Sequence, residues 1–130
     1  MAASFTISEL EKAAGTLLEA LKFSEQVKAN ESQFKIARDA CIKRFEYCIE
    51  LAWKVSLKKL GSQTRFPKPA VRDMARADLI DSAEEWLDFI EARNNTSHSY
   101  DEEIARKVFV QIQKFSVKVQ VLIANLKKLP

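Results

Sequence analysis

Apolar residues recur at helical spacing along nearly the whole chain, and this periodicity is the feature that most limits its fold. The stripes comprise Leu10, Ala13, Leu17 and Leu21, then Phe34, Ala37, Cys41, Phe45, Cys48, Ala52 and Val55, and finally Ile104, Val108, Ile112, Phe115, Val119, Leu122 and Leu126. A recurrence of three to four residues places side chains on one face of an α-helix. Only two glycines and three prolines occur in 130 residues, whereas a β-rich fold needs more turn residues. We therefore predict an all-α fold.

Capping signals divide the chain into its helices. The expected segments are a helix from near Thr6 to near Asn30, a long one over 32–60 that either Asn30 or Ser32 can start, a linker at 61–69, a short helix over 70–77, a helix from Asp81, and a last helix that begins near Ser99 or Asp101. Three pairs resemble capping boxes, in which a polar side chain precedes a glutamate by three residues: Thr6 with Glu9, Asp81 with Glu84, and Ser99 with Glu102. Gly61 is well placed to end the long helix. Leu79 and Ile80 are expected to enter the core after the short helix.

The bulk composition indicates one soluble globular domain over 1–130. Hydrophobic residues make up 47% and charged residues 30%, which is not the composition of a disordered chain. No apolar run approaches the roughly 20 residues that span a bilayer, and the N-terminus Met1-Ala2-Ala3-Ser4-Phe5 has no secretion pattern. Cys41 and Cys48 lie about 10 Å apart on one helix, too far for a disulfide. We expect free core thiols, no membrane contact and a cytoplasmic location.

The long helix carries more apolar surface than one seam needs. Ile42, Ile49 and Trp53 lie off its main stripe. Either this helix is central in the bundle, or its second face meets a partner. The sequence leaves both alternatives open.

A basic span extends from the end of the long helix into the short one. The span contains six cationic residues and only one acidic residue, Asp73. The cationic residues are Lys58, Lys59, Arg65, Lys68, Arg72 and Arg76. They are either solvated side chains that complement a helix dipole or an electrostatic footprint for RNA or a nucleotide. The net charge of +3 permits contact with nucleic acid without requiring it.

The polar stretch 93–101 holds most of the chemistry in the chain, including its single histidine. On an unbroken helix Arg93 and His98 would lie about 140° apart. The intervening Asn, Thr and Ser side chains compete for backbone hydrogen bonds and favour a break, after which both could turn inward. His98 would then precede a helix N-terminus, which favours anions. A lone histidine near a helix cap is also ordinary in helical proteins.

An imidazole and a guanidinium suffice for RNA cleavage by transesterification. His98 can exchange a proton with a ribose hydroxyl or a leaving oxygen, and Arg93 can grip phosphate oxygens. Asn94 could orient the phosphate or the histidine, and Tyr100 could do the same or be modified. We expect no metal and no cofactor, because the cysteines lie on another helix and no glycine-rich phosphate loop is present.

The chain resembles the nucleotidyltransferase substrate-binding protein family. The resemblance covers nearly everything from Phe34 onward. It is carried by Phe45-Glu46, Leu51-Ala52-Trp53-Lys54, Ala77-Asp78-Leu79-Ile80-Asp81, Glu85-Trp86-Leu87-Asp88 and Arg93-Asn94-Asn95-Thr96-Ser97-His98-Ser99-Tyr100. That family belongs to the HEPN group, which is marked by an arginine followed a few residues later by a histidine. Here the pair is Arg93 and His98, with Tyr100 two residues further on, as in HEPN toxins that are paired with a minimal nucleotidyltransferase.

The resemblance implies an antiparallel, up-and-down bundle of four to five helices and a homodimer that juxtaposes two copies of the motif. It also implies two functions. In the first, the protein is a toxin, a metal-independent endoribonuclease with Arg93, His98 and Asn94 in its site, which a partner nucleotidyltransferase silences by transferring AMP to Tyr100. In the second, it is a non-catalytic subunit that binds substrate or nucleotide for a separately encoded nucleotidyltransferase.

Overall fold

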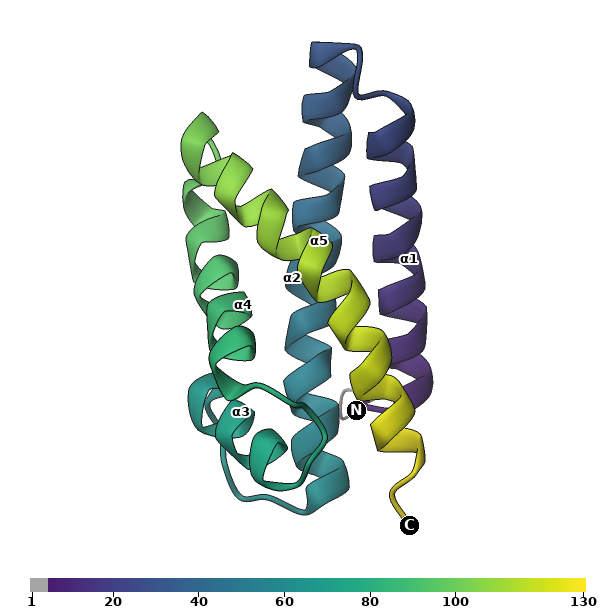
Figure 1. The fold of residues 1–130 in the computed structure, drawn as a ribbon, viewed down its shortest axis with the longest axis vertical. Coiled ribbons are helices and arrows are strands. Elements are labelled where there is room, and N and C mark those ends of the chain that lie inside the picture. The colour runs from purple at the N-terminus through teal and green to yellow at the C-terminus, as the bar shows by residue number, and fades with distance from the viewer. Residues whose placement is uncertain (1–4) are drawn as a thin grey trace.

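The computed structural model describes residues 5–130, and every secondary-structure element in this range is a helix. The elements are α1 (Ile7–Gln26), α2 (Glu31–Leu60), α3 (Pro67–Arg76), α4 (Ala83–Asn95), the short 3₁₀ turn η1 (Thr96–His98) and α5 (Glu102–Lys127) (Figure 1). The described residues contain no strand. The all-α prediction is therefore confirmed.

The four long helices alternate in direction. Figure 1 shows α1 and α2 side by side, α4 along the other side of α2, and α5 descending diagonally across the front from the top of α4 toward the C-terminus. The short α3 packs against α2 and α4 at the lower end. This arrangement places η1, with its histidine, and α3, with most of the basic span, at opposite ends of the bundle.

Helix α2 is the centre of the bundle. It packs against α1, α3, α4 and α5, and the three apolar residues that lie off its main stripe, Ile42, Ile49 and Trp53, are buried. The extra apolar surface of this helix therefore belongs to the core, which decides between the two alternatives that the sequence left open.

An aromatic cluster joins α2, α4 and α5 below the polar stretch. Phe115 makes edge-to-face contacts with Phe45, Trp86 and Phe89, with ring centroids 5.1–5.5 Å apart. All four side chains are fully buried. Aromatic edges prefer the faces of neighbouring rings, so this cluster fixes how α4 lies against α2 and thereby places the last turn of α4.

Some predicted caps are confirmed. The Thr6 hydroxyl accepts a hydrogen bond from the Glu9 backbone N–H at 3.1 Å. Gly61 follows α2 in the left-handed conformation, with φ of 67°, which glycine adopts without steric cost. Leu79 and Ile80 are buried as expected. These signals are local, and the sequence was sufficient to find them.

Other predicted boundaries were wrong. Helix α1 ends at Gln26 rather than near Asn30, because the Asn30 side chain caps α2 by accepting from the Gln33 N–H at 2.9 Å. Helix α3 begins at Pro67 rather than Ala70, since proline is tolerated in a first helical turn.

The start of α4 also differs from the prediction. Helix α4 begins at Ala83 rather than Asp81, because the cap is Ser82, whose hydroxyl accepts from the Glu85 N–H at 3.1 Å. At α5 the cap is Asp101, one of the two predicted starts, and the alternative Ser99–Glu102 box does not form. Neighbouring polar residues compete for a cap, and the sequence alone does not rank them.

Cys41 and Cys48 are free thiols buried in the core, as predicted. Burial raises the pKa of the Cys48 thiol to about 12. None of the helices in the described part of the chain is long and apolar enough to cross a membrane. The secretion-pattern argument falls on Met1–Ser4, which lie outside the described residues.

Candidate functional site

The polar stretch breaks the helix between Arg93 and His98, as its composition predicted. Helix α4 ends at Asn95 and continues as the single 3₁₀ turn η1. The Thr96 hydroxyl oxygen lies 2.8 Å from the Arg93 carbonyl oxygen, and the Ser99 backbone N–H donates to the Thr96 carbonyl at 3.2 Å. Side-chain competition for the last carbonyls of the helix accounts for the break.

Arg93 turns toward the middle of α2. Its Nη1 lies 3.7 Å from Glu46 Oε2, and its Nε lies 3.6 Å from Glu50 Oε1. The Nε is buried and has no hydrogen-bond partner. The guanidinium therefore lies between two carboxylates of α2, which offset its charge at ion-pair distance without a direct hydrogen bond.

Glu46 connects both sides of the break to α2. Its Oε2 accepts a 2.6 Å hydrogen bond from the Thr96 hydroxyl and also faces Arg93. Sequence reasoning missed Glu46 and Glu50 as site residues. Their signal was present: two acids one turn apart on the same helix, within a segment whose other faces are apolar.

His98 and Tyr100 face solvent instead of the bundle. Both side chains are exposed, and the Tyr100 side chain reaches 86% exposure. Their rings meet edge to face with centroids 6.2 Å apart. Asn94 is also exposed. Within one chain, then, Arg93 is anchored on α2, whereas His98, Tyr100 and Asn94 remain accessible to a ligand.

The N-terminus of α5 already holds acidic groups. Asp101 accepts from the Ile104 N–H at 3.1 Å, and Glu102 and Glu103 occupy the first turn. Buried Arg38 donates both Nη groups to Glu102 at 2.8 and 2.7 Å. This pairing lowers the pKa of Glu102 to about 2 and raises the pKa of Arg38. An anion at this helix end would compete with these carboxylates.

The basic span lies far from the motif within one chain. All six of its cations are exposed, and Lys58 lies roughly 18 Å along α2 from Glu46 at 1.5 Å per residue. Asp73 forms an ion pair with Arg76 at 3.0 Å and accepts hydrogen bonds from Ser62 and Thr64, which lower its pKa. The structure thus turns Arg93 inward onto α2 but leaves His98 in solvent, so the expectation that both turn inward is wrong within one chain, and the basic span lies apart from them.

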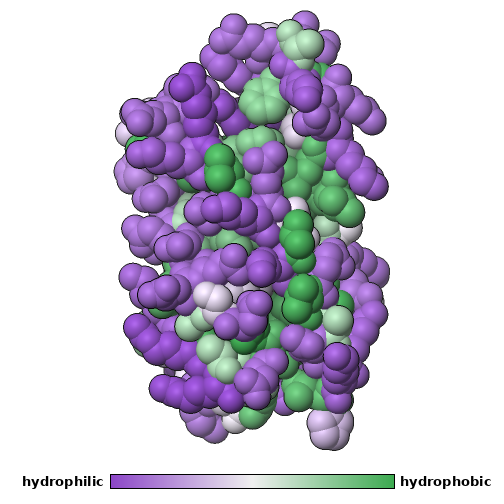
Figure 2. Space-filling model, in the orientation of Figure 1, coloured by the Kyte–Doolittle hydropathy of each residue, from purple (hydrophilic) through white to green (hydrophobic). Residues whose placement is uncertain are grey.

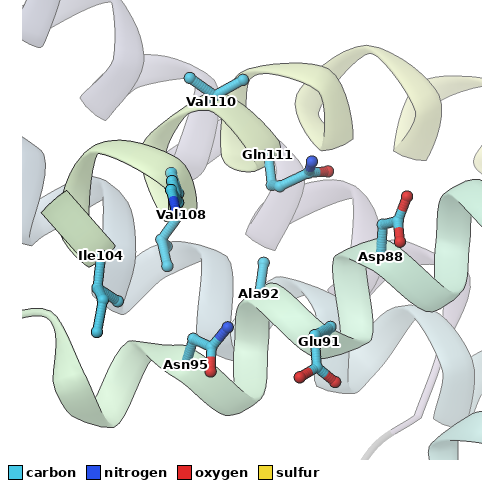
Figure 3. A pocket seen from close by; sticks show the side chains of 9 residues that line it. Asp88, Glu91, Ala92, Asn95, Ile104, Val108, Val110 and Gln111 are labelled. Atoms are coloured by element: carbon cyan, nitrogen blue, oxygen red, sulfur yellow. The ribbon is translucent and has the colours of Figure 1, made fainter.

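A groove of about 580 Å³ runs between α4 and α5 (Figure 3). Ala92, Ile104 and Val108 point into it, while Asp88 and Glu91 lie along its α4 side. The polar groups that line the groove include Asp88, Glu91 and Lys107, and neither Arg93 nor His98 is among its lining residues. Within residues 5–130, no group of three or more His, Cys, Asp or Glu side chains could hold a metal ion.

Comparison with known proteins gives concordant results. The family described as "nucleotidyltransferase substrate binding protein like" matches residues 5–128. A Haemophilus influenzae protein named "Probable ribonuclease HepT" is 30% identical over 95 residues, which cover 67% of this chain. The chain spans about two thirds, 65%, of that relative's length.

Two solved structures share the fold. One, from Haemophilus influenzae, is described as revealing the fold of a substrate binding domain of a nucleotidyltransferase. It is 22% identical with a TM-score of 0.76, over 94% of this chain and 99% of the other. The second, from Thermus thermophilus, is 27% identical with a TM-score of 0.77, over 92% and 99%.

Proposed function

The chain belongs to the nucleotidyltransferase substrate binding protein family, and we propose that it acts as a HEPN-type, metal-independent endoribonuclease of a toxin–antitoxin pair. The observation that carries the proposal is the broken helix of the motif, which anchors Arg93 on α2 and leaves His98 exposed. The named HepT relative supports the same activity.

The proposed reaction is cleavage by transesterification. His98 removes the proton from a ribose 2′-hydroxyl, the 2′-oxygen bonds to the adjacent phosphorus, and the bond from phosphorus to the 5′-oxygen breaks. The 5′-oxygen takes up a proton, which leaves a 2′,3′-cyclic phosphate and a 5′-hydroxyl. Arg93 stabilises the extra charge on the five-coordinate phosphorus, and Asn94 orients the phosphate. The exposed cations of the basic span bind the RNA backbone further away.

A homodimer supports this chemistry, because a second copy could supply its Arg93 to the exposed His98 of the first. Exposed apolar residues are available for such contact on α5, namely Val110, Val117 and Val121. In Figure 2, which views the face crossed by α5, apolar side chains form a broken band between hydrophilic borders. Light scattering of the purified chain tests the dimer, and a monomer at micromolar concentration would contradict it.

Regulation by a partner nucleotidyltransferase completes the proposal. The Tyr100 oxygen attacks the α-phosphorus of ATP, pyrophosphate leaves, and the phenolic proton passes to solvent or to the partner. The 86% exposure of Tyr100 makes this oxygen accessible to a second protein. After incubation with partner and ATP, mass spectrometry should find AMP on the Tyr100 peptide and none in Tyr100→Phe. An adduct on another residue would contradict this step.

A second candidate function is a non-catalytic subunit that binds substrate or nucleotide for a separately encoded nucleotidyltransferase. One observation favours it: Arg93 lies between two carboxylates, Glu46 and Glu50, which reduce its attraction for phosphate. In this alternative, Arg93 and His98 stabilise the turn or contact a partner protein, and they do not cleave RNA. The partner would then modify a small molecule much faster with this chain than alone.

The decisive experiment is RNA cleavage by the purified chain in excess EDTA, beside His98→Ala. The ribonuclease proposal expects products with 2′,3′-cyclic phosphate ends, at a rate about 10²–10⁴ times higher than in the variant. Circular dichroism should show the same helical fold in both, because the replaced side chain is exposed. Absence of cleavage by an unmodified dimer over several RNAs would favour the second candidate.

A further inference from the structure

A cleft of about 520 Å³ lies beside the exposed histidine, between α2 and the turn that precedes α5. We call it the α2–turn cleft. Its α2 side presents Lys35, Arg38 and Lys43 among carboxylates, and Tyr100 and Glu102 lie on its other side. Its volume falls within the roughly 300–1,000 Å³ of sites for small ligands. Neither Arg93 nor His98 lines this cleft, so their proposed catalytic roles assign it no function.

We propose that the α2–turn cleft is a nucleotide subsite, which holds the RNA nucleotide next to the bond that is cut. The base lies against Tyr100, and the phosphates on its two sides contact Lys35 and Lys43. The inference rests on the proposed ribonuclease function and assigns that function a substrate-positioning surface outside Arg93, His98 and Asn94.

The two lysines are the available cations of the cleft. The Lys43 side chain is 87% exposed and lies only within 3.9 Å of Glu46, while the half-exposed Lys35 lies 3.4 Å from Glu31. Such exposed pairs are weak, so either ammonium can exchange its carboxylate for a phosphate. The lysines are two helical turns apart, roughly 12 Å of rise, and their long side chains suit the two ends of one nucleotide.

Arg38 has a different role in the cleft. Its guanidinium is buried and donates both Nη groups to Glu102. It therefore ties the start of α5 to α2 and forms a fixed part of the cleft lining, rather than a cation that is free to bind phosphate.

Tyr100 supplies an aromatic surface at the mouth of the cleft. Its ring lies near the His98 ring, at 6.2 Å between centroids, and Tyr100 is 86% exposed, so much of its ring surface is accessible. Unpaired RNA bases stack on such rings with little sequence preference. A base on Tyr100 would lie directly beside the imidazole, which positions the attached ribose for the proposed proton transfer.

The carboxylates narrow the choice of ligand. Asp39, Glu46 and Glu102 balance the three cations of the cleft, so a phosphate alone gains little attraction there. A nucleoside unit has donors for these acceptors in its ribose hydroxyls and base amines. The mixture of acceptors, lysines and an aromatic ring fits a nucleotide better than an inorganic anion or an apolar molecule.

The test measures binding of a fluorescein-labelled hexaribonucleotide by anisotropy, with all variants built on His98→Ala so that no cleavage occurs. Lys35→Ala with Lys43→Ala should raise Kd about tenfold, and Tyr100→Leu should do the same, whereas Tyr100→Phe should bind like the parent because stacking persists. The charge-matched control is Lys12→Ala with Lys127→Ala, two exposed lysines outside the cleft that also face carboxylates, which should change Kd less than about twofold.

Equal effects of the two lysine pairs, unchanged binding by Tyr100→Leu, or no measurable binding by the folded parent would each overturn the subsite. Cleavage assays separate its failure from that of the ribonuclease proposal. If chains with intact His98 cleave RNA and the cleft variants cleave at the full rate, the subsite is wrong and the ribonuclease stands. If the intact chain cleaves nothing but the binding differences hold, the nucleotide subsite stands without the ribonuclease.

Discussion

The two ends of the bundle carry charge in different ways. At the motif end, Arg93 faces Glu46 and Glu50, and Arg38 is bound to Glu102, so cations on one element meet acids on another. At the α3 end, Arg76 is the one cation of the basic span that has an ion pair among the described residues, and its partner Asp73 lies on the same helix.

The two charge arrangements suit different tasks: one orients a cation, and the other attracts a polyanion. A guanidinium held between carboxylates has a defined direction, which transition-state stabilisation requires, but its field is partly cancelled. Exposed cations have no fixed direction, yet they attract a polyanion over roughly a Debye length of 8–10 Å. Under the ribonuclease proposal, the motif end orients one phosphate and the α3 end attracts a chain of them.

The largest effect is expected from Arg93→Lys. A lysine ammonium is a point charge that cannot bridge two carboxylates and still present a planar edge to phosphate. Under the ribonuclease proposal, single-turnover cleavage in EDTA should fall about hundredfold. The comparison at the α3 end is Arg76→Lys, which keeps the positive charge near Asp73 that backbone contact needs and should lower the single-turnover rate less than about twofold. Equal rates for the two variants would erase the contrast between the ends.

A smaller effect is expected from Lys68→Ala with Arg72→Ala in the basic span. If both side chains contact RNA phosphates, the slope of log affinity against log salt should become shallower by about 1.4, or 0.7 per lost contact. The loss of affinity should be similar for all RNA sequences. The Lys12→Ala with Lys127→Ala chain is the charge-matched control. An unchanged slope would mean that the span is solvated surface.

The parts of the fold that were predictable depend on neighbours in sequence. Helical periodicity located α2 and α5, and a glycine after Leu60 marked the end of α2. Boundaries failed where two polar residues compete for one cap, as Asp81 and Ser82 do. Which of them wins depends on the backbone direction, which packing of the whole bundle decides.

The candidate site was predictable only in part, for the same reason. The break after Asn95 follows from residues inside the stretch. The partners that hold it do not: Thr96 bonds to Glu46 across 50 positions, and Arg38 to Glu102 across 64. No local pattern predicts such pairs. Likewise, the distance between the basic span and His98 follows from the antiparallel course of α2 and α4 and not from composition.

The smallest effect at neutral pH, and the one most specific to the motif end, is expected from Glu102→Gln. The hydrogen bonds from Arg38 lower the pKa of Glu102 from 4.5 to about 2. A carboxylate whose pKa is lower in the folded state contributes its stability fully above the unfolded value and loses it as pH falls toward the folded one. The free energy of unfolding of the wild-type chain should therefore decline between about pH 5 and pH 2 more steeply than that of the variant.

Urea unfolding followed by circular dichroism at several pH values measures this difference. Glu103→Gln is the control, because its side chain is exposed and pairs only with Lys107 at 3.8 Å. The gap between wild type and Glu102→Gln should be largest near neutral pH and should close as Glu102 takes up its proton. A gap that stays constant down to pH 2, or that Glu103→Gln reproduces, would show that the charge of the Glu102 carboxylate does not stabilise the turn, and that the Thr96–Glu46 contact and the aromatic cluster position the motif without it.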